Sequence, residues 1–296
     1  MEVRKNSLEA WVLAMRPKTL TGAAIPVLVA SALAWIDGRF CWLPAGLCLV
    51  FACLMQVAAN FINDLFDYLK GSDRPDRLGP ERACAQGWIS PGAMKWGIAV
   101  VVVLACLDGL GLLAFGNPTL LVGIGLGCVV FAFLYTIVLS YCGMGDVLVL
   151  VFFGLVPVVG TYYVVTGQTT SEAWLAGVVC GLLIDTLLVL NNYRDRDTDR
   201  RDGKHTLVTI FGERFGRYFY LVNGLIVIAL VAAIYVRREW WDPVGVGALV
   251  VYLALHLRAW RILARIRSGA GLVRALALSS ANLLILSVML AFAFVF

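Results

Sequence analysis

Long apolar runs, divided by short polar breaks, dominate this chain and restrict what it can fold into. The hydrocarbon core of a bilayer is about 30 Å thick, so a helix needs about 20 apolar residues to cross it. Nine segments are suitable, at 19–36, 42–66, 93–115, 118–138, 145–166, 173–193, 217–236, 243–260 and 275–295. We therefore predict an all-α integral membrane protein with nine transmembrane helices.

The composition also indicates a protein that is surrounded by lipid. Hydrophobic residues make up 61% of the 296 positions and charged residues only 15%, which is too little charge to cover a soluble surface. The longest polar gaps, around 67–92 and 194–216, leave no room for a soluble domain, so we expect a single transmembrane domain over 1–296. The eight cysteines lie mostly singly in apolar runs, which indicates packing residues.

The basic residues are distributed unevenly between the two membrane faces. With a cytoplasmic N-terminus, 21 of the 24 Lys and Arg residues fall on the cytoplasmic side, and only Arg39, Arg237 and Arg238 fall on the other. This asymmetry follows the positive-inside rule and, with nine helices, places the C-terminus outside. We therefore attribute the net charge of +5 to topology and expect no nucleic-acid partner.

Two polar clusters with matching spacing occur at the ends of apolar segments. The first motif contains Asn60, Asp64 and Asp67, and the second motif contains Asn191, Asp195 and Asp199. Residues at i, i+4 and i+7 or i+8 share one face of a helix, so each motif forms a stripe. The motifs end the second and the sixth segments, which predicts a pseudo-repeat of four-helix units with the site between the halves.

The residue types in these stripes predict a magnesium and diphosphate site. An aspartate inside a membrane costs about 2.5–3.5 kcal/mol, and a bound cation would offset that cost. Carboxylate and amide oxygens suit Mg²⁺, which commonly also binds substrate phosphates. Nearby bases are candidates for the phosphate side: Lys70, Arg77, Arg82, Arg194 and Lys204.

Simpler interpretations compete with this prediction. Polar residues can terminate helices and solvate loops, and Asp73, Asp76, Asp197 and Asp202 fit that role. An ion-coupled secondary transporter also uses intramembrane carboxylates, but here the polar residues gather at one membrane face. A phosphatidyl-group transferase would need one compact Asp motif, whereas this chain has two that are widely separated.

Several longer motifs together resemble the UbiA superfamily of membrane prenyltransferases. The resemblance lies in the segments 16–20, 56–82, 141–146 and 191–207. It implies a ring of nine helices around a central cavity, with a lateral opening for a lipid tail and diphosphate held by Mg²⁺ between the two motifs. The string from Gly71 to Pro80 favours the branch that acts on 1,4-dihydroxy-2-naphthoate over the branch that acts on 4-hydroxybenzoate.

The resemblance also implies a reaction and a location. A polyprenyl group would pass from an all-trans polyprenyl diphosphate to 1,4-dihydroxy-2-naphthoate, with loss of CO₂ and diphosphate, giving demethylmenaquinone in menaquinone biosynthesis. Lys18 would grip the naphthoate carboxylate, and Asp64, Asp67, Asp195 and Asp199 would be catalytic metal ligands. We expect the bacterial inner membrane, with the active site facing the cytoplasm. Two departures from the family pattern are Gly71, where an aspartate is frequent, and the segment 137–140.

Overall fold

The structure is a computed structural model that describes residues 3–71, 79, 81–239, 243–266, 268–269 and 271–293. Its regular structure in these ranges is entirely helical. The α-helices are α1 (Leu8–Met15), α2 (Pro17–Ile36), α3 (Trp42–Leu69), α4 (Pro91–Leu112), α5 (Pro118–Ile137), α6 (Gly145–Val149), α7 (Val156–Thr166), α8 (Ser171–Arg201), α9 (Leu207–Arg238), α10 (Pro243–Arg265) and α11 (Leu272–Ala293). Short 3-10 turns, η1 (Leu113–Phe115) and η2 (Leu139–Tyr141), and a π-helical segment, η3 (Leu150–Leu155), complete the list.

The predicted all-α membrane fold is confirmed. Eight helical segments of the described chain are long and apolar enough to cross a membrane, with α6, η3 and α7 forming one of them. The ninth predicted segment falls in α11, whose apolar stretch over Leu272–Ser287 is shorter within the described side chains. The helices around the two motifs extend beyond the predicted apolar runs, because α8 continues to Arg201 and α9 begins at Leu207.

Local sequence signals explain where these helices begin. Ser90, Asn117, Thr170 and Thr206 each accept a hydrogen bond from the backbone N–H three residues later, at the starts of α4, α5, α8 and α9. Such side chains satisfy the amide groups that have no partner inside a helix. Proline occupies the first position of α2, α4 and α5, where its missing N–H removes no helical bond.

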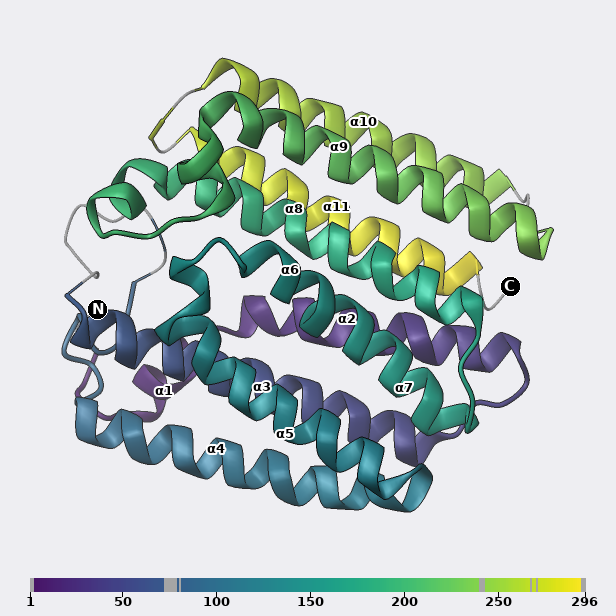
Figure 1. Cartoon of the computed structure of the whole chain (residues 1–296), viewed down its shortest axis with the longest axis horizontal. Coiled ribbons are helices and arrows are strands. Elements are labelled where there is room, and N and C mark those ends of the chain that lie inside the picture. Colours follow the sequence, from purple (N-terminus) through teal and green to yellow (C-terminus); the bar gives the residue numbers. More distant parts are fainter. Residues whose placement is uncertain are drawn as a thin grey trace.

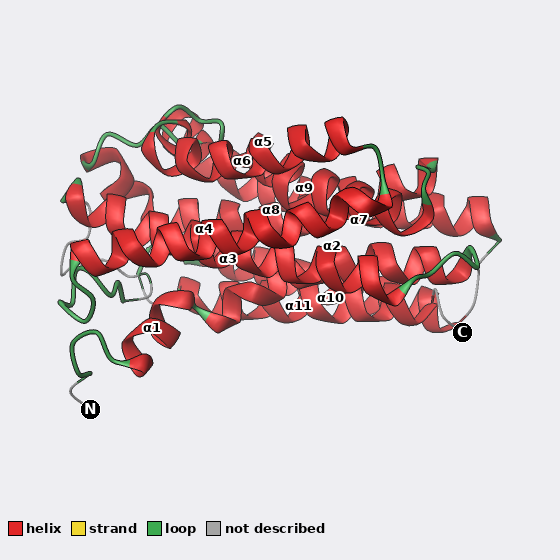
Figure 2. Ribbon diagram, turned by 90° about the horizontal axis from the view of Figure 1, so that it is seen from below, coloured by secondary structure: helices red, strands yellow, loops and turns green. Residues whose placement is uncertain are grey.

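The helices lie in two groups with α2 and α7 between them (Figure 1). One group contains α3, α4 and α5, and the other contains α8 to α11. Helix α2 contacts α3 and α7 on one side and α8 and α11 on the other. Figure 2 shows the long helices running along a common direction, so their ends gather at two opposite ends of the bundle. The enclosed cavity and the four-helix repeat remain predictions.

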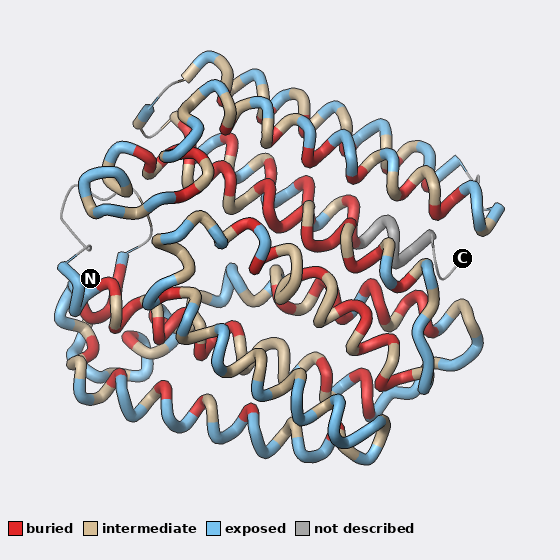
Figure 3. Tube along the Cα trace, viewed as in Figure 1, coloured by how far each residue is buried: buried red, intermediate tan, exposed pale blue. Residues whose placement is uncertain are grey.

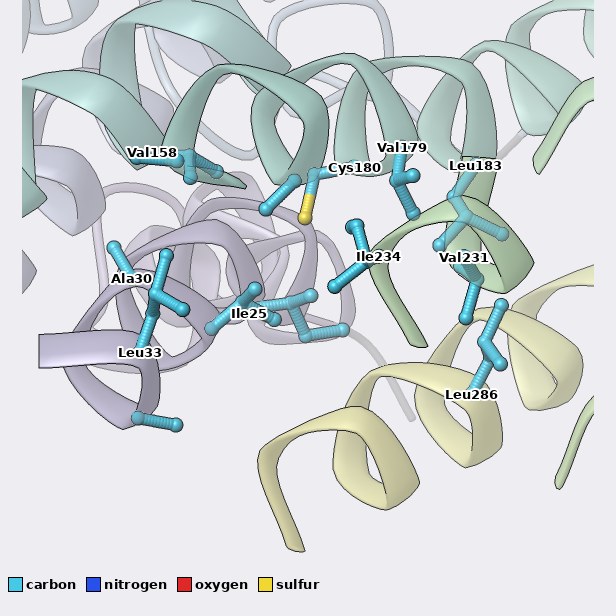
Figure 4. Close-up of a cluster of buried hydrophobic side chains, with 14 of the residues drawn as sticks. Ile25, Ala30, Leu33, Val158, Val179, Cys180, Leu183, Val231, Ile234 and Leu286 are labelled. Atoms are coloured by element: carbon cyan, nitrogen blue, oxygen red, sulfur yellow. The ribbon is translucent and has the colours of Figure 1, made fainter. Parts of the chain in front are cut away.

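Buried side chains join the two groups along the middle of the bundle. Ile25 and Leu33 of α2 pack with Val179 and Leu183 of α8 in the largest cluster, part of which Figure 4 shows. Many apolar side chains of α4 and α5, such as Leu104 and Leu126, are exposed, as expected for surfaces that face lipid. Figure 3 shows exposed positions along both helices.

The contact between η3 and α8 depends on small residues. A Cβ atom added to Gly154 would lie 2.4 Å from the carbonyl oxygen of Gly177 and 2.6 Å from the Cα atom of Gly181. No larger side chain fits there without moving the backbone. Small residues of this kind let membrane helices approach closely, and here they fix the position of α8, which carries the second motif.

Candidate functional site

The two acidic motifs lie on helices that end in the same way. Gly71 follows the last turn of α3 with φ of +71°, and Gly203 follows the last turn of α8 with φ of +74°. A side chain is disfavoured in this left-handed conformation, which glycine adopts freely. The departure of Gly71 from the family pattern therefore has a structural reason: this position terminates a helix.

The first motif is tied to the segment that follows it. Arg82 is buried and its Nη2 atom donates a 2.8 Å hydrogen bond to Oδ2 of Asp67. Asp64 is fully buried, and its two oxygens accept hydrogen bonds of 2.8 Å from the backbone N–H groups of Ala83 and Cys84. Asp64 therefore stabilises the turn at residues 82–84, and this turn positions Arg82 against Asp67.

Asn60 connects the first motif to the beginning of α2. Its Nδ2 atom donates to the carbonyl oxygen of Met15 at 2.8 Å and to Oγ1 of Thr19 at 2.9 Å. Its Oδ1 atom accepts a 3.1 Å hydrogen bond from Gln56. Asn60 thus holds the turn that contains Lys18, whose side chain is exposed at the first turn of α2.

The second motif also contains an internal arginine and carboxylate pair. Arg194 is buried and donates two 2.6 Å hydrogen bonds to the carboxylate of Asp195, one from Nε and one from Nη2. Asn191 and Asp199 are half-buried on the same helix. Each motif therefore pairs one aspartate with one arginine, and such pairs limit the repulsion between neighbouring carboxylates.

Tyr141 brings the basic residues of the two motifs together. The Nζ atom of Lys70 lies 3.9 Å from the centre of the Tyr141 ring, and that of Lys204 lies 5.5 Å from it. Lys70 also donates to the carbonyl oxygen of Ile137 at 2.8 Å, and the His205 N–H donates to the Tyr141 carbonyl at 3.2 Å. The segment from α5 to α6 thus contacts residues that follow both motifs.

Tyr135 provides a second link between the motifs. It belongs to α5, and it lies within electrostatic range of Asp67 in the first motif and Asp199 in the second. The next residue of α5, Thr136, donates a hydrogen bond to Oδ1 of Asn63. Helix α5 therefore contributes polar groups to the space between the motifs.

A buried polar cluster that the sequence analysis did not assign lies beside these residues. Asp185 of α8 accepts a 2.6 Å hydrogen bond from Asn223 of α9, and its carboxyl group is within hydrogen-bonding reach of Asp146 of α6. All three side chains are buried. The available signal was the charge of Asp185 within an apolar run, because ionisable residues inside a membrane are rare and frequently functional.

The predicted site residues are placed at one end of the bundle but not in one ligand cluster. Among the described residues, no three Asp, Glu, His or Cys side chains are grouped closely enough to hold a metal ion. Arg77 lies outside the described residues. The oxygen donors still suit a hard divalent cation, and Asp67 and Asp195 are each already paired with a cationic group.

Comparison with known proteins identifies relatives over most of the chain. The UbiA prenyltransferase family matches residues 23–280. The 1,4-dihydroxy-2-naphthoate octaprenyltransferase of Escherichia coli (strain K12) is 40% identical over 240 residues, which cover 77% of this chain and 78% of the relative. The protein of the same name from Mycobacterium tuberculosis is 33% identical over 270 residues, covering 90% of this chain and 88% of the relative.

Solved structures show the same fold at low sequence identity. A UbiA homolog from Aeropyrum pernix K1 has a TM-score of 0.70 at 14% identity and covers 90% of this chain and 96% of its own. A UbiA homolog from Archaeoglobus fulgidus bound to DMAPP and Mg²⁺ has a TM-score of 0.62 at 15% identity and covers 94% and 99%. The chain is a multi-pass membrane protein that belongs to the UbiA prenyltransferase family.

Proposed function

We propose that this protein transfers a polyprenyl group from an all-trans polyprenyl diphosphate to 1,4-dihydroxy-2-naphthoate, with loss of CO₂ and diphosphate, giving demethylmenaquinone in its reduced, quinol form. The enzyme is then an aromatic prenyltransferase of menaquinone biosynthesis. The relatives at 32–40% identity, which are named for this acceptor, support the choice of substrate. The single structural observation that carries the proposal is the position of Tyr141 beside Lys70 and Lys204, which follow the two motifs.

The oxygen donors of both motifs would hold magnesium. Asp64, Asp67, Asp195 and Asp199, with Asn60 and Asn191, form the proposed ligand set. When bound, Mg²⁺ neutralises the charge of the diphosphate and favours its departure. A divalent cation is supported by the Archaeoglobus fulgidus homologs, which have been solved with Mg²⁺ or Cd²⁺.

The basic residues would bind the diphosphate oxygens. Lys70 and Lys204 lie beside one ring, where two cations can approach one dianionic group. Arg82 and Arg194 hold Asp67 and Asp195, and a guanidinium that already bonds a carboxylate can donate further N–H groups to phosphate. Arg77 completes the proposed diphosphate set. These fixed positive groups stabilise the charge that develops as the bond to diphosphate breaks.

The carbon chemistry requires an allylic donor and an electron-rich ring. The bond between the prenyl carbon and the diphosphate oxygen breaks, a carbon–carbon bond forms to the naphthoate ring, and the ring carboxylate leaves as CO₂. Water must be kept from the allylic cation, and the bilayer around the bundle supports that exclusion. Lys18 would bind the naphthoate carboxylate, since Asn60 ties its turn to the first motif.

The location follows from the distribution of charge. We infer one prenyl-transfer domain over residues 1–296 in the bacterial inner membrane, with the N-terminus and the active site on the cytoplasmic side. The basic residues next to both motifs and at the end of α10 support this orientation. The lipid bilayer is also the source of the polyprenyl donor.

The proposal is tested by identifying the product. Purified protein in lipid vesicles is incubated with Mg²⁺, an all-trans polyprenyl diphosphate and either 1,4-dihydroxy-2-naphthoate or 4-hydroxybenzoate, and products are analysed by mass spectrometry. We expect a prenylated, decarboxylated naphthalenediol, which oxygen in air oxidises to the naphthoquinone, and no prenylated benzoate. Prenylation of the benzoate alone would assign the enzyme to the other branch, and the absence of both products would contradict the proposed activity.

A further inference from the structure

A groove between α9 and α10 is lined by none of the residues proposed for prenyl transfer. It is lined by Arg214, Arg217, Tyr218, Trp260 and Ala264 and has a volume of about 530 Å³. The first three residues lie near the start of α9 and the other two near the end of α10. Because α9 begins directly after the second motif, the groove is at the same end of the bundle as both motifs.

The groove carries positive charge, and Glu213 of α9 is the one acidic residue in the described residues of α9 and α10. No Asp or Glu occurs between Arg214 and Arg238, and none occurs between Pro243 and the last residue. Within the described part of the chain, the nearby acid Glu213 accepts a 2.8 Å hydrogen bond from Arg196. The positive charge of the groove therefore favours binding of an anion from outside the protein.

The side chains that line the groove include hydrogen-bond donors. Arg217 donates a long hydrogen bond of 3.4 Å to the carbonyl oxygen of Ala264, which leaves most of its guanidinium N–H groups for another acceptor. The Nε1 atom of Trp260 is buried and has no hydrogen-bond partner among the described residues. A buried indole N–H normally finds an acceptor, so this donor also indicates a missing ligand.

Two aromatic residues accompany these donors at the end of the membrane-spanning helices. Tyr218 is 53% exposed, and Trp260 lies four positions before Ala264 on the same face of α10. Tyrosine and tryptophan prefer the headgroup region of a bilayer, and basic pockets between transmembrane helices recognise anionic lipid headgroups. We propose that this groove binds the phosphoryl headgroup of an anionic phospholipid.

Topology alone would also place arginines at this end of α10. That explanation treats all exposed arginines alike, so Arg261 and Arg265 provide a matched control: they lie on the same helix and are exposed, but they do not line the groove. A specific lipid site requires the groove arginines and is insensitive to the control pair. Diffuse attraction to an acidic membrane depends equally on both pairs.

Native mass spectrometry of the detergent-purified protein tests this site. Phosphatidylglycerol, phosphatidylcholine with the same acyl chains, and inorganic phosphate are titrated separately onto the wild type, Arg214→Gln/Arg217→Gln, Trp260→Phe and Arg261→Gln/Arg265→Gln. We expect the first phosphatidylglycerol to bind the groove double variant at least about tenfold more weakly, and the control variant to match the wild type. Trp260→Phe removes the indole N–H donor but keeps an aromatic ring in the groove, and we expect it to weaken binding several-fold.

Four results would overturn the proposal. Equal binding of phosphatidylcholine would remove the requirement for an anionic headgroup, and equal binding of inorganic phosphate would indicate a site for a free anion. An equal loss in the control variant would attribute binding to diffuse charge. If the double variant fails to fold, unchanged phosphatidylglycerol binding by Trp260→Phe contradicts the site. The measurement does not depend on prenyl transfer, so its outcome is separate from that of the proposed activity.

Discussion

The ammonium group of Lys70 lies 3.9 Å from the centre of the Tyr141 ring. Lys70 follows the first acidic motif, and Tyr141 belongs to the connection between α5 and α6, which also contacts Lys204 after the second motif. An aromatic face attracts cations, and Tyr141 therefore holds two like-charged groups near each other. In the proposed function, this pair of cations would bind the oxygens of the diphosphate.

We expect the ring of Tyr141, and not its hydroxyl group, to support diphosphate binding. Its hydroxyl oxygen is buried and makes no hydrogen bond among the described residues. Tyr141→Leu should raise KM for the prenyl diphosphate about threefold to tenfold, because a cation–π contact contributes about 0.5–2 kcal/mol. Tyr141→Phe is the matched control and should behave like the wild type in steady-state kinetics. A larger effect of Phe than of Leu would refute this role for the ring.

Asp64 should contribute to folding even without metal. Its carboxylate accepts two backbone N–H groups, and Asp64→Ala leaves both of them buried without an acceptor. The loss is about 2–4 kcal/mol, which should lower the unfolding temperature by several degrees with or without Mg²⁺. Asp64→Asn keeps one acceptor oxygen and should lose less stability. An unfolding temperature for Asp64→Ala equal to that of the wild type in EDTA would contradict this role.

The pair formed by Asp185 and Asp146 should tolerate an amide at position 185. In Asp185→Asn, the amide oxygen can accept from Asn223 while its NH₂ group donates to Asp146, so both neighbours keep a partner. We expect its thermal stability to equal or exceed that of the wild type. Asp185→Ala removes both interactions and should lower stability by about 1–3 kcal/mol. The opposite order of these two variants in thermal unfolding would show that the carboxylate itself is required.

The connection between Asp37 and Arg238 should make stability depend on pH. Burial of Asp37 opposes its ionisation, but hydrogen bonds from Arg238 at 2.8 Å and Tyr162 at 2.5 Å outweigh burial and hold the pKa of Asp37 below its usual value. A lowered pKa in the folded state stabilises the protein above the unfolded value of about 3.9, and this contribution is lost as pH falls through the folded value.

Asp37→Asn tests this connection directly. Thermal unfolding of the variant and of the wild type is compared from pH 7 to pH 3 in one detergent. We expect the variant to be less stable by about 1–2 kcal/mol from pH 7 to pH 5. The difference should shrink as pH falls below about 4, where the unfolded wild-type chain binds a proton at Asp37 while the folded protein still holds this carboxylate ionised. A constant difference across the whole range would exclude ionisation of Asp37 as its cause.

The sequence predicted the membrane fold well because lipid imposes a simple rule on length and hydropathy. The segments around Trp42–Leu69 and Ser171–Arg201 were found for that reason, although their polar ends were underestimated. The motif residues lie inside these helices. Helix α8 continues past Asp199 to Arg201, because arginine has a high helix propensity and is favourable in the last turn of a helix. Hydropathy is insensitive to such polar turns.

Contacts between distant residues could not be predicted from local pattern. Asp64 bonds backbone groups at 83 and 84, and Asp37 bonds an arginine 201 positions later. The left-handed conformation of Gly71 depends on where α3 ends, which periodicity does not fix. Asp185 was visible as a charge in an apolar run, but only the packing of α8 against α6 and α9 places it beside Asp146 and Asn223.

The central claim is that the two motifs form one site, and binding of an unreactive prenyl thiodiphosphate tests it most directly. Calorimetric titration with Mg²⁺ present compares the wild type, Asp67→Asn, Asp195→Asn and the double variant. We predict that either single change weakens binding by at least about 30-fold. The double variant should bind only slightly more weakly than the single variants, because each motif contributes to binding only when the other is intact. Wild-type affinity in either single variant, or fully additive losses, would contradict a shared site.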